Sequence, residues 1–186
     1  IMAKEMQKLV FEILPQLAEN TLFYRNWDTK NKEHLKQAIF LADDQKALRE
    51  ELKKRNLTAF VADGAVLPRE SGISDRPMRG AVPFSSPESM KIELELPHKG
   101  RIAGMGIPEG ITVIVGGGYH GKSTLLKALE QGVYDHIAGD GREYVVADNS
   151  GVKIRAEDGR SVLHTDISLF INHLPAGQDT TDFSSE

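Results

Sequence analysis

The sequence predicts an α/β fold with an antiparallel β portion and a helical N-terminal segment. Three observations support this prediction. Apolar residues recur at helical spacing over 3–19, alternate as in a strand over 90–96, and form a continuous run over 111–115. That run leads through a glycine-rich loop into a helical segment, an order of elements typical of a P-loop core.

Composition narrows the class of protein. The chain has 186 residues, of which 40% are hydrophobic and 27% charged, so it can bury a core. It has no cysteine, which excludes disulfides and suits a reducing compartment. No run approaches the ~20 apolar residues of a membrane-spanning helix, so we expect a cytoplasmic protein without a membrane partner. An Ile precedes the first Met, and we therefore expect the chain to begin within a longer protein.

Charge is distributed unevenly. The net charge is −4, but residues 1–60 carry 11 basic and 9 acidic residues, against 12 and 18 in residues 61–186. We interpret most of this charge as ordinary solvated surface. A basic N-terminal face that contacts RNA is the alternative.

The N-terminal segment is expected to be mainly helical. Pro15 should kink or end the helix over 3–19, because it lacks an N–H group. Asp43 or Asp44 is a candidate N-cap for a later helix. The other expected elements in this segment are helices at 31–41 and 44–55 and a strand at 57–62.

We expect three regions: a helical segment with one strand (1–67), a linker or loop rich in Pro, Gly and Ser (68–87), and a partial nucleotide-binding domain (88–186). Residues 111–115 should form a strand that is buried on both faces. The other expected elements of the last region are strands at 90–96, 101–105, 143–147, 152–155 and 168–172, and a helix at 121–131.

The glycine-rich loop matches the phosphate-loop (Walker A) pattern G-x-x-x-x-G-K-[ST] from Gly116 to Ser123. Glycines leave backbone N–H groups accessible to phosphate, and the following helix directs its positive dipole end at the anion. Lys122 should contact the β- and γ-phosphates, and Ser123 should hold Mg²⁺. The expected nucleotide-binding residues are Gly116, Gly117, Gly118, Tyr119, His120, Gly121, Lys122, Ser123 and Thr124.

Phosphate-loop ATPases also need an acidic residue after an apolar strand. Asp148 follows such a run but lies only 26 residues after Lys122, and Asp63 lies before the loop. Both are interpreted mainly as strand-ending turn residues. We therefore expect nucleotide binding without the catalytic acid in this chain.

Longer runs resemble the predicted ABC-class ATPase family. They are "LTAFVADGAVLPRESG", "GMGIPEGITVIVGGGYHGKSTLLKALEQGVYDHIAGDGREYVV", "VKIRAEDGRSV", "DISLFINHLPAGQDT" and "FSSE". The resemblance spans most of residues 57–186 and is loose over 1–56. It implies an ABC-type core that binds ATP with Mg²⁺ and hydrolyses it in a homodimer. In such proteins a signature segment and an acidic strand follow "FSSE", so we expect this chain to be an inactive fragment.

The resemblance also directs attention to single residues. Gln178 is a candidate for the glutamine that senses Mg²⁺ and water in ABC domains. No aromatic residue lies between Phe84 and Tyr119, so Tyr119 or His98 is the candidate for stacking on adenine. His120 is interpreted mainly as a solvated side chain.

Two other functions stay open. A small-molecule or nucleoside kinase would need an acceptor pocket and an Asp base in this chain, and an RNA-binding module would hold a nucleotide structurally. The segments 139–143 and 153–160 contain Asp140, Arg142, Arg155, Glu157 and Asp158. No mechanism follows from these residues, and turns between short strands are their simplest interpretation.

Overall fold

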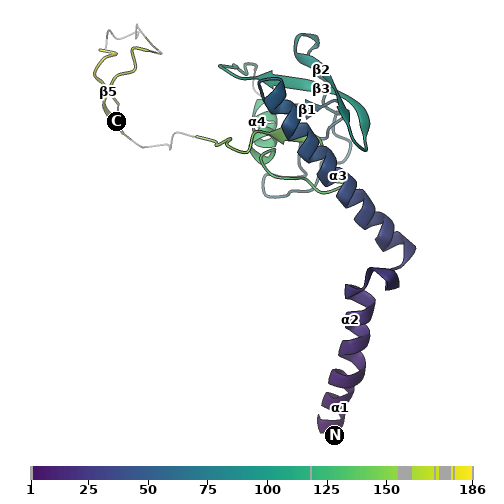
Figure 1. Cartoon of the computed structure of the whole chain (residues 1–186). Helices are drawn as coiled ribbons and strands as arrows, with labels where there is room; N and C mark the ends of the chain where they lie inside the picture. Colours follow the sequence, from purple (N-terminus) through teal and green to yellow (C-terminus); the bar gives the residue numbers. More distant parts are fainter. Residues whose placement is uncertain are drawn as a thin grey trace. The chain divides into compact units, whose positions relative to one another are not determined.

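The computed structural model describes residues 2–117, 119–154, 161–169, 171, 177 and 179–185. It divides into two units, Ile1–Gly151 and Val152–Glu186. In chain order the elements are α1 (Met2–Lys8), η1 (Leu9–Ile13), α2 (Leu14–Leu22), η2 (Tyr24–Asn26), α3 (Thr29–Lys54), β1 (Leu57–Ala62), η3 (Glu88–Met90), β2 (Lys91–Leu96), β3 (Gly100–Pro108), α4 (Lys122–Gln131), β4 (Val145–Ala147), β5 (Val162–Thr165) and β6 (Phe183–Ser185). Figure 1 labels the α-helices and most of the strands.

The helix predicted over 3–19 is confirmed and is continuous through Pro15. The turn before the proline is a π-helix, η1, in which the N–H of Leu14 donates to the carbonyl of Leu9. A proline ring clashes with the carbonyl four residues before it, and a wider turn relieves such a clash. Pro15 therefore stands in the first turn of α2 instead of ending the helix.

The prediction of two helices at 31–41 and 44–55 is wrong, because α3 is one helix of 26 residues. Its N-cap is Asp28, whose side chain accepts a hydrogen bond from the N–H of Asn31 at 2.7 Å. No Gly or Pro interrupts the segment between the predicted helices. Asp43 and Asp44 are therefore helix-interior residues, and the carboxylate of Asp44 is bound elsewhere.

The first unit contains a four-stranded sheet in the order β2-β3-β1-β4, in which each neighbouring pair is antiparallel. The strands predicted at 57–62, 90–96, 101–105 and 143–147 all fall on these strands. Glycines allow close approach within the sheet: a Cβ at Gly104 would lie 2.8 Å from the Cα of Ala62. β1 and β3 consequently pack tightly at the centre.

The two faces of the sheet carry separate apolar clusters. Side chains of β1 alternate between them, as strand geometry requires. Val61 packs with Ala128 of α4, whereas Phe60 packs with Leu48 and Leu52 of α3. Helix α3 thus covers one face and α4 the other (Figure 1), and the fold is mixed α/β as predicted.

The expected buried strand at 111–115 is a prediction that the structure contradicts. These residues have no regular structure, and Ile111 and Val115 are 97% and 81% exposed. A strand needs a neighbour for its backbone hydrogen bonds. Among the described residues, no strand pairs with this segment, and both sides of β1 are already occupied by β3 and β4.

Two more predicted strands are not observed where the structure describes them. Residues 152–154 form no strand, and neither do 168, 169 and 171; the remaining residues of the two predictions lie outside the described residues. The second unit instead pairs β5 with β6 in antiparallel orientation. The three predicted regions, divided at 67/68 and 87/88, stay a prediction.

The segment 68–87 follows a defined path. The N–H of Met78 donates to the carbonyl of Pro68 at 3.0 Å, and the N–H of Phe84 donates to the carbonyl of Ala65 at 2.8 Å. The guanidinium of Arg69 binds both carboxylate oxygens of Asp140 at 2.9 Å. Hydrogen bonds with the preceding turn and with segment 139–143 therefore hold this loop.

Candidate nucleotide-binding site

The glycine-rich loop curls at its junction with α4. Gly121 is the N-cap of the helix with φ +79°, and Tyr119 has φ +60°. This left-handed conformation costs a residue with a side chain roughly 1–2 kcal/mol and costs glycine little. The second glycine of the pattern G-x-x-x-x-G-K-[ST] thus stands where the backbone favours glycine.

The lysine of the motif reaches back over the loop. The ammonium of Lys122 donates to the carbonyl oxygen of Gly116 at 2.6 Å and to that of Gly117. A Cβ at Gly117 would lie 3.1 Å from Cε1 of the His120 ring, so this ring lies against the glycine backbone. The loop therefore places one positive charge at the N-terminal end of α4, next to bare backbone.

The first turn of α4 leaves hydrogen-bond donors accessible. The first intrahelical bond at this end runs from the N–H of Leu125 to the carbonyl of Gly121, at 2.9 Å. The N–H groups of the three preceding residues, Lys122 to Thr124, have no acceptor among the described residues, as expected for a helix start. The hydroxyls of Ser123 and Thr124 likewise have no partner within the described ranges. Such groups can bind an anion, and a hydroxyl can also bind a metal ion.

The other candidate site residues lie in different surroundings. Tyr119 is fully exposed and stacks on no described ring. His98 already stacks on Phe40, with ring centroids 4.0 Å apart. Gly118 and Gln178 lie outside the described residues, as do Arg155, Glu157 and Asp158.

The two candidate acids follow strands, and each accepts hydrogen bonds from a serine. One carboxylate oxygen of Asp148 accepts from the N–H and hydroxyl of Ser150, at 2.9 and 2.6 Å. An oxygen of Asp63 accepts from the N–H and hydroxyl of Ser86, both at 2.6 Å. The side-chain hydrogen bond is the largest cause of the lowered pKa of each carboxyl group. Both carboxylates are thus engaged by hydrogen bonds, Asp148 with its own turn and Asp63 with a residue 23 positions away.

Sequence reasoning missed two residues of α3 whose side chains bind backbone carbonyls in the segment after α4. The guanidinium of Arg49 lies 3.3 Å from the carbonyl oxygens of Gly132 and Val133, just beyond the end of α4. The side-chain amide of Gln45 donates to the carbonyls of His136 and Glu143 at 2.9 and 2.8 Å. The available signal was a Gln and an Arg placed among the leucines of a helical segment. Their partners lie more than 80 positions away.

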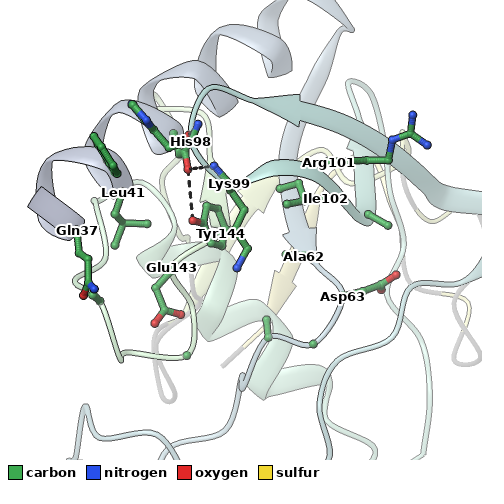
Figure 2. A pocket seen from close by; sticks show the side chains of 17 residues that line it. Gln37, Leu41, Ala62, Asp63, His98, Lys99, Arg101, Ile102, Glu143 and Tyr144 are labelled. Carbon is green, nitrogen blue, oxygen red and sulfur yellow. Dashed lines mark hydrogen bonds between the residues drawn. The ribbon is translucent and has the colours of Figure 1, made fainter.

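A separate cavity of about 770 Å³ lies between α3, the β2–β3 turn and residues 138–144. Figure 2 shows Lys99, Tyr144 and Glu143 around it. Asp44 accepts from the N–H groups of His98 and Lys99 at 2.8 and 2.9 Å and so holds the turn. None of the described residues of the phosphate-loop motif lines this cavity.

The P-loop domain model of the ABC ATPase family matches residues 31–186. The chain belongs to this family. An uncharacterized protein of Methanocaldococcus jannaschii is 35% identical to it over 142 residues, which cover 72% of this chain and 32% of the relative. The chain thus spans about a third of the length of this curated relative. No helix among the described residues is long and apolar enough to cross a membrane.

Membership of the ABC ATPase family agrees with the resemblance found in the sequence and suggests that the chain binds a nucleotide. The match begins at residue 31 and so leaves out α1, η1, α2, η2 and the first two residues of α3. It includes the rest of α3, whose side chains Gln45 and Arg49 contact residues beyond α4. The part of α3 that binds the residues following the P-loop helix therefore lies within the family domain.

Proposed function

We propose that residues 116–124 of this ABC ATPase family member bind the triphosphate of ATP. The observation that carries the proposal is the return of the Lys122 ammonium to the Gly116 carbonyl, 2.6 Å away, which curls the loop. The free N–H groups at the start of α4 add donors, and the helix dipole favours an anion there. Phosphate oxygens would accept from both the ammonium and these amides.

We assign Ser123 as the protein ligand of Mg²⁺. No cluster of three or more His, Asp or Glu side chains among the described residues is placed to hold a metal ion alone. Mg²⁺ usually takes few protein ligands and completes its shell with water and substrate phosphates. The hydroxyl of Ser123, in the first turn of α4, fits that role. When bound, the ion would neutralise phosphate charge.

Nucleotide affinity with and without the motif lysine tests the proposal. We expect Lys122→Ala to weaken Mg-ATP binding by about tenfold or more in calorimetric titration, because a charge-assisted bond is lost. Lys127→Ala is the matched control: this lysine is on the same helix and pairs with Glu130 at 3.5 Å. Equal affinities of the two variants would contradict the proposed site.

Hydrolysis is proposed for the longer protein, in a homodimer in which each loop faces the other subunit. The proposal rests on the family, and on the engagement of Asp63 and Asp148 by Ser86 and Ser150. We expect this chain to bind ATP with little turnover and a longer chain to hydrolyse it. Rapid phosphate transfer by a monomer of this chain would favour the kinase alternative instead.

RNA is the second candidate ligand, and one surface favours it. The guanidinium of Arg25 lies 5.2 Å from the centre of the Phe23 ring, and the ammonium of Lys32 lies 5.4 Å from that of Tyr24. Exposed aromatic rings beside basic groups are typical of single-strand binding. Salt-sensitive binding of an RNA oligonucleotide that survives Lys122→Ala would support this candidate. We also propose that the protein is located in the cytoplasm.

A further inference from the structure

The helical arm, defined as residues 2–40, contains no buried residue although it is rich in large apolar side chains. Met6, Ile13 and Leu17 are 61%, 45% and 55% exposed, and Ile39 is 51% exposed. Isolated helices gain too little from propensity alone and are stabilised mainly by burying an apolar face. A contiguous exposed apolar surface of this kind marks an interaction site. The arm therefore needs a covering surface.

The turn between α2 and α3 is held by its own hydrogen bonds. The indole N–H of Trp27 donates to the carbonyl of Thr21 at 2.9 Å, and the amide of Asn26 donates to that of Glu19 at 2.9 Å. Lys32 donates to the carbonyl of Arg25 at 3.1 Å. With the turn held in this way, the apolar side chains of α2 and of the first turns of α3 do not bury one another.

Charge indicates what covers the arm. Residues 2–22 carry three glutamates, Glu5, Glu12 and Glu19, against two lysines, whereas residues 29–40 carry three lysines against one glutamate. The glutamates recur every seven residues, close to two helical turns. No ion pair joins them to a cation of the described residues. The two segments are thus both apolar and opposite in charge.

We propose that a second copy of this chain covers the arm. The apolar face of α1–α2 in one copy packs on residues 29–40 of α3 in the other copy, and twofold symmetry repeats the contact. Glu12 and Lys36 are examples of the opposite charges at its rim. The α1–α2 side of this contact lies outside the family match, which begins at residue 31, and neither side includes a residue of the P-loop motif. The contact is therefore distinct from the nucleotide-dependent dimer proposed above. The dimer forms without ATP.

Disulfide trapping tests the contact directly, because the chain has no cysteine of its own. One sample carries Ile13→Cys and another carries Leu35→Cys. After mixing and oxidation we expect a disulfide-linked heterodimer as the main product. A mixture of Leu35→Cys with Asn149→Cys, a position outside the arm, serves as the control and should crosslink far less.

Light scattering after size exclusion gives an independent readout. We expect the unmodified chain and Lys122→Ala to be dimers without nucleotide, and Ile13→Glu to be monomeric. Gln16→Glu, on the same helix, is the matched control and should stay dimeric. Circular dichroism checks that Ile13→Glu is folded. We expect it to be, because no residue of the arm is buried.

Three results would overturn the proposal. The first is an unmodified chain that is a monomer, whether its arm stays free or binds added RNA. The second is an equal yield in the control mixture. The third is an intramolecular disulfide as the main product of a chain carrying both Ile13→Cys and Leu35→Cys at high dilution. If Lys122→Ala loses ATP binding but is still a dimer, the proposed contact is supported, because the loss concerns only the nucleotide site.

Discussion

The guanidinium of Arg49 on α3 lies 3.3 Å from the carbonyl oxygen of Gly132, directly after the last residue of α4. Carbonyl groups at a helix end lack intrahelical partners, and a cation there also meets the negative end of the dipole. The same side chain binds Val133 and pairs with Asp135. Arg49 thus connects the helix that covers one face of the sheet to the one that covers the other.

We predict that Arg49→Ala lowers the free energy of unfolding by about 1–2 kcal/mol, because buried carbonyls lose a charged donor. Arg49→Lys should recover only a fraction of this, since an ammonium cannot reproduce the guanidinium fork. Urea unfolding measures the change. Lys46→Ala, an exposed position one turn earlier, should change stability by less than about 0.5 kcal/mol. A similar loss in both variants would contradict the role of Arg49.

The carboxylate of Asp44 provides a second prediction. It is 1% exposed and accepts from the backbone N–H groups of His98 and Lys99. Asp44→Ala should lower the free energy of unfolding by about 2–3 kcal/mol, because two N–H groups lose a charged acceptor. Asp43→Ala removes an exposed carboxylate 3.3 Å from His98 and should cost less than about 1 kcal/mol. Equal losses in denaturant unfolding would show that Asp44 does not hold the turn.

The sequence predicted those elements of the fold whose signal is local. The alternation over 90–96 and the helix after Gly121 depend on neighbouring residues alone, and both are observed as β2 and α4. The split of α3 failed because Asp43 and Asp44 look like capping residues in isolation. The acceptor role of Asp44 depends on a turn 54 residues away. Burial of residues 111–115 failed for a related reason, since a strand exists only beside its neighbours.

The candidate site divides in the same way. Lys122 and Gly121 follow from an eight-residue pattern whose physical requirements are local. By contrast, Gln45 and Arg49 stand 91 and 83 residues from the carbonyls they bind. The sequence suggested no role for Asp140. Its partner Arg69 lies 71 residues away, in the loop that follows β1. Only the folded chain brings these pairs together.

Tyr144 provides a prediction at high pH. Burial, followed by the nearby carboxylate of Asp44, raises the pKa of Tyr144 from 10.0 to about 12. The phenol keeps its proton in the folded state up to a pH at which the unfolded chain has lost it. Stability from this group is therefore fully present below pH 10 and decreases between pH 10 and about 12. The stability of Tyr144→Phe should fall less over this range.

The ultraviolet absorbance of tyrosinate checks the same point in the folded protein. The difference between the unmodified chain and Tyr144→Phe should be one titration step centred near pH 12. Asp44→Asn removes the neighbouring charge and should move that step to lower pH, provided the variant is folded. A step near pH 10.0 in the difference between the two chains would contradict the prediction.

His136 provides a prediction at acid pH, where we expect stability to fall as the pH is lowered. Its Nδ1 lies 2.7 Å from a carboxylate oxygen of Asp140, whereas its Nε2 is buried without a partner among the described residues. Burial is the largest cause of a lowered pKa for His136, outweighing the attraction of Asp140, and Arg142 and Arg69 lower it further. The folded chain thus binds a proton less readily than the unfolded chain, whose histidine has its ordinary pKa of 6.5.

Stability from neutral His136 is therefore present above pH 6.5 and is lost as the pH falls through the lowered pKa of the folded state. His136→Asn keeps a donor for Asp140 and cannot be protonated in this range, so its free energy of unfolding should fall less steeply below pH 6.5. Urea unfolding at a series of pH values measures the difference. Carboxyl groups such as Asp63 titrate in both chains and cancel in the comparison. Parallel pH profiles would mean that water reaches the buried Nε2 and that the imidazole ionises as freely as in the unfolded chain.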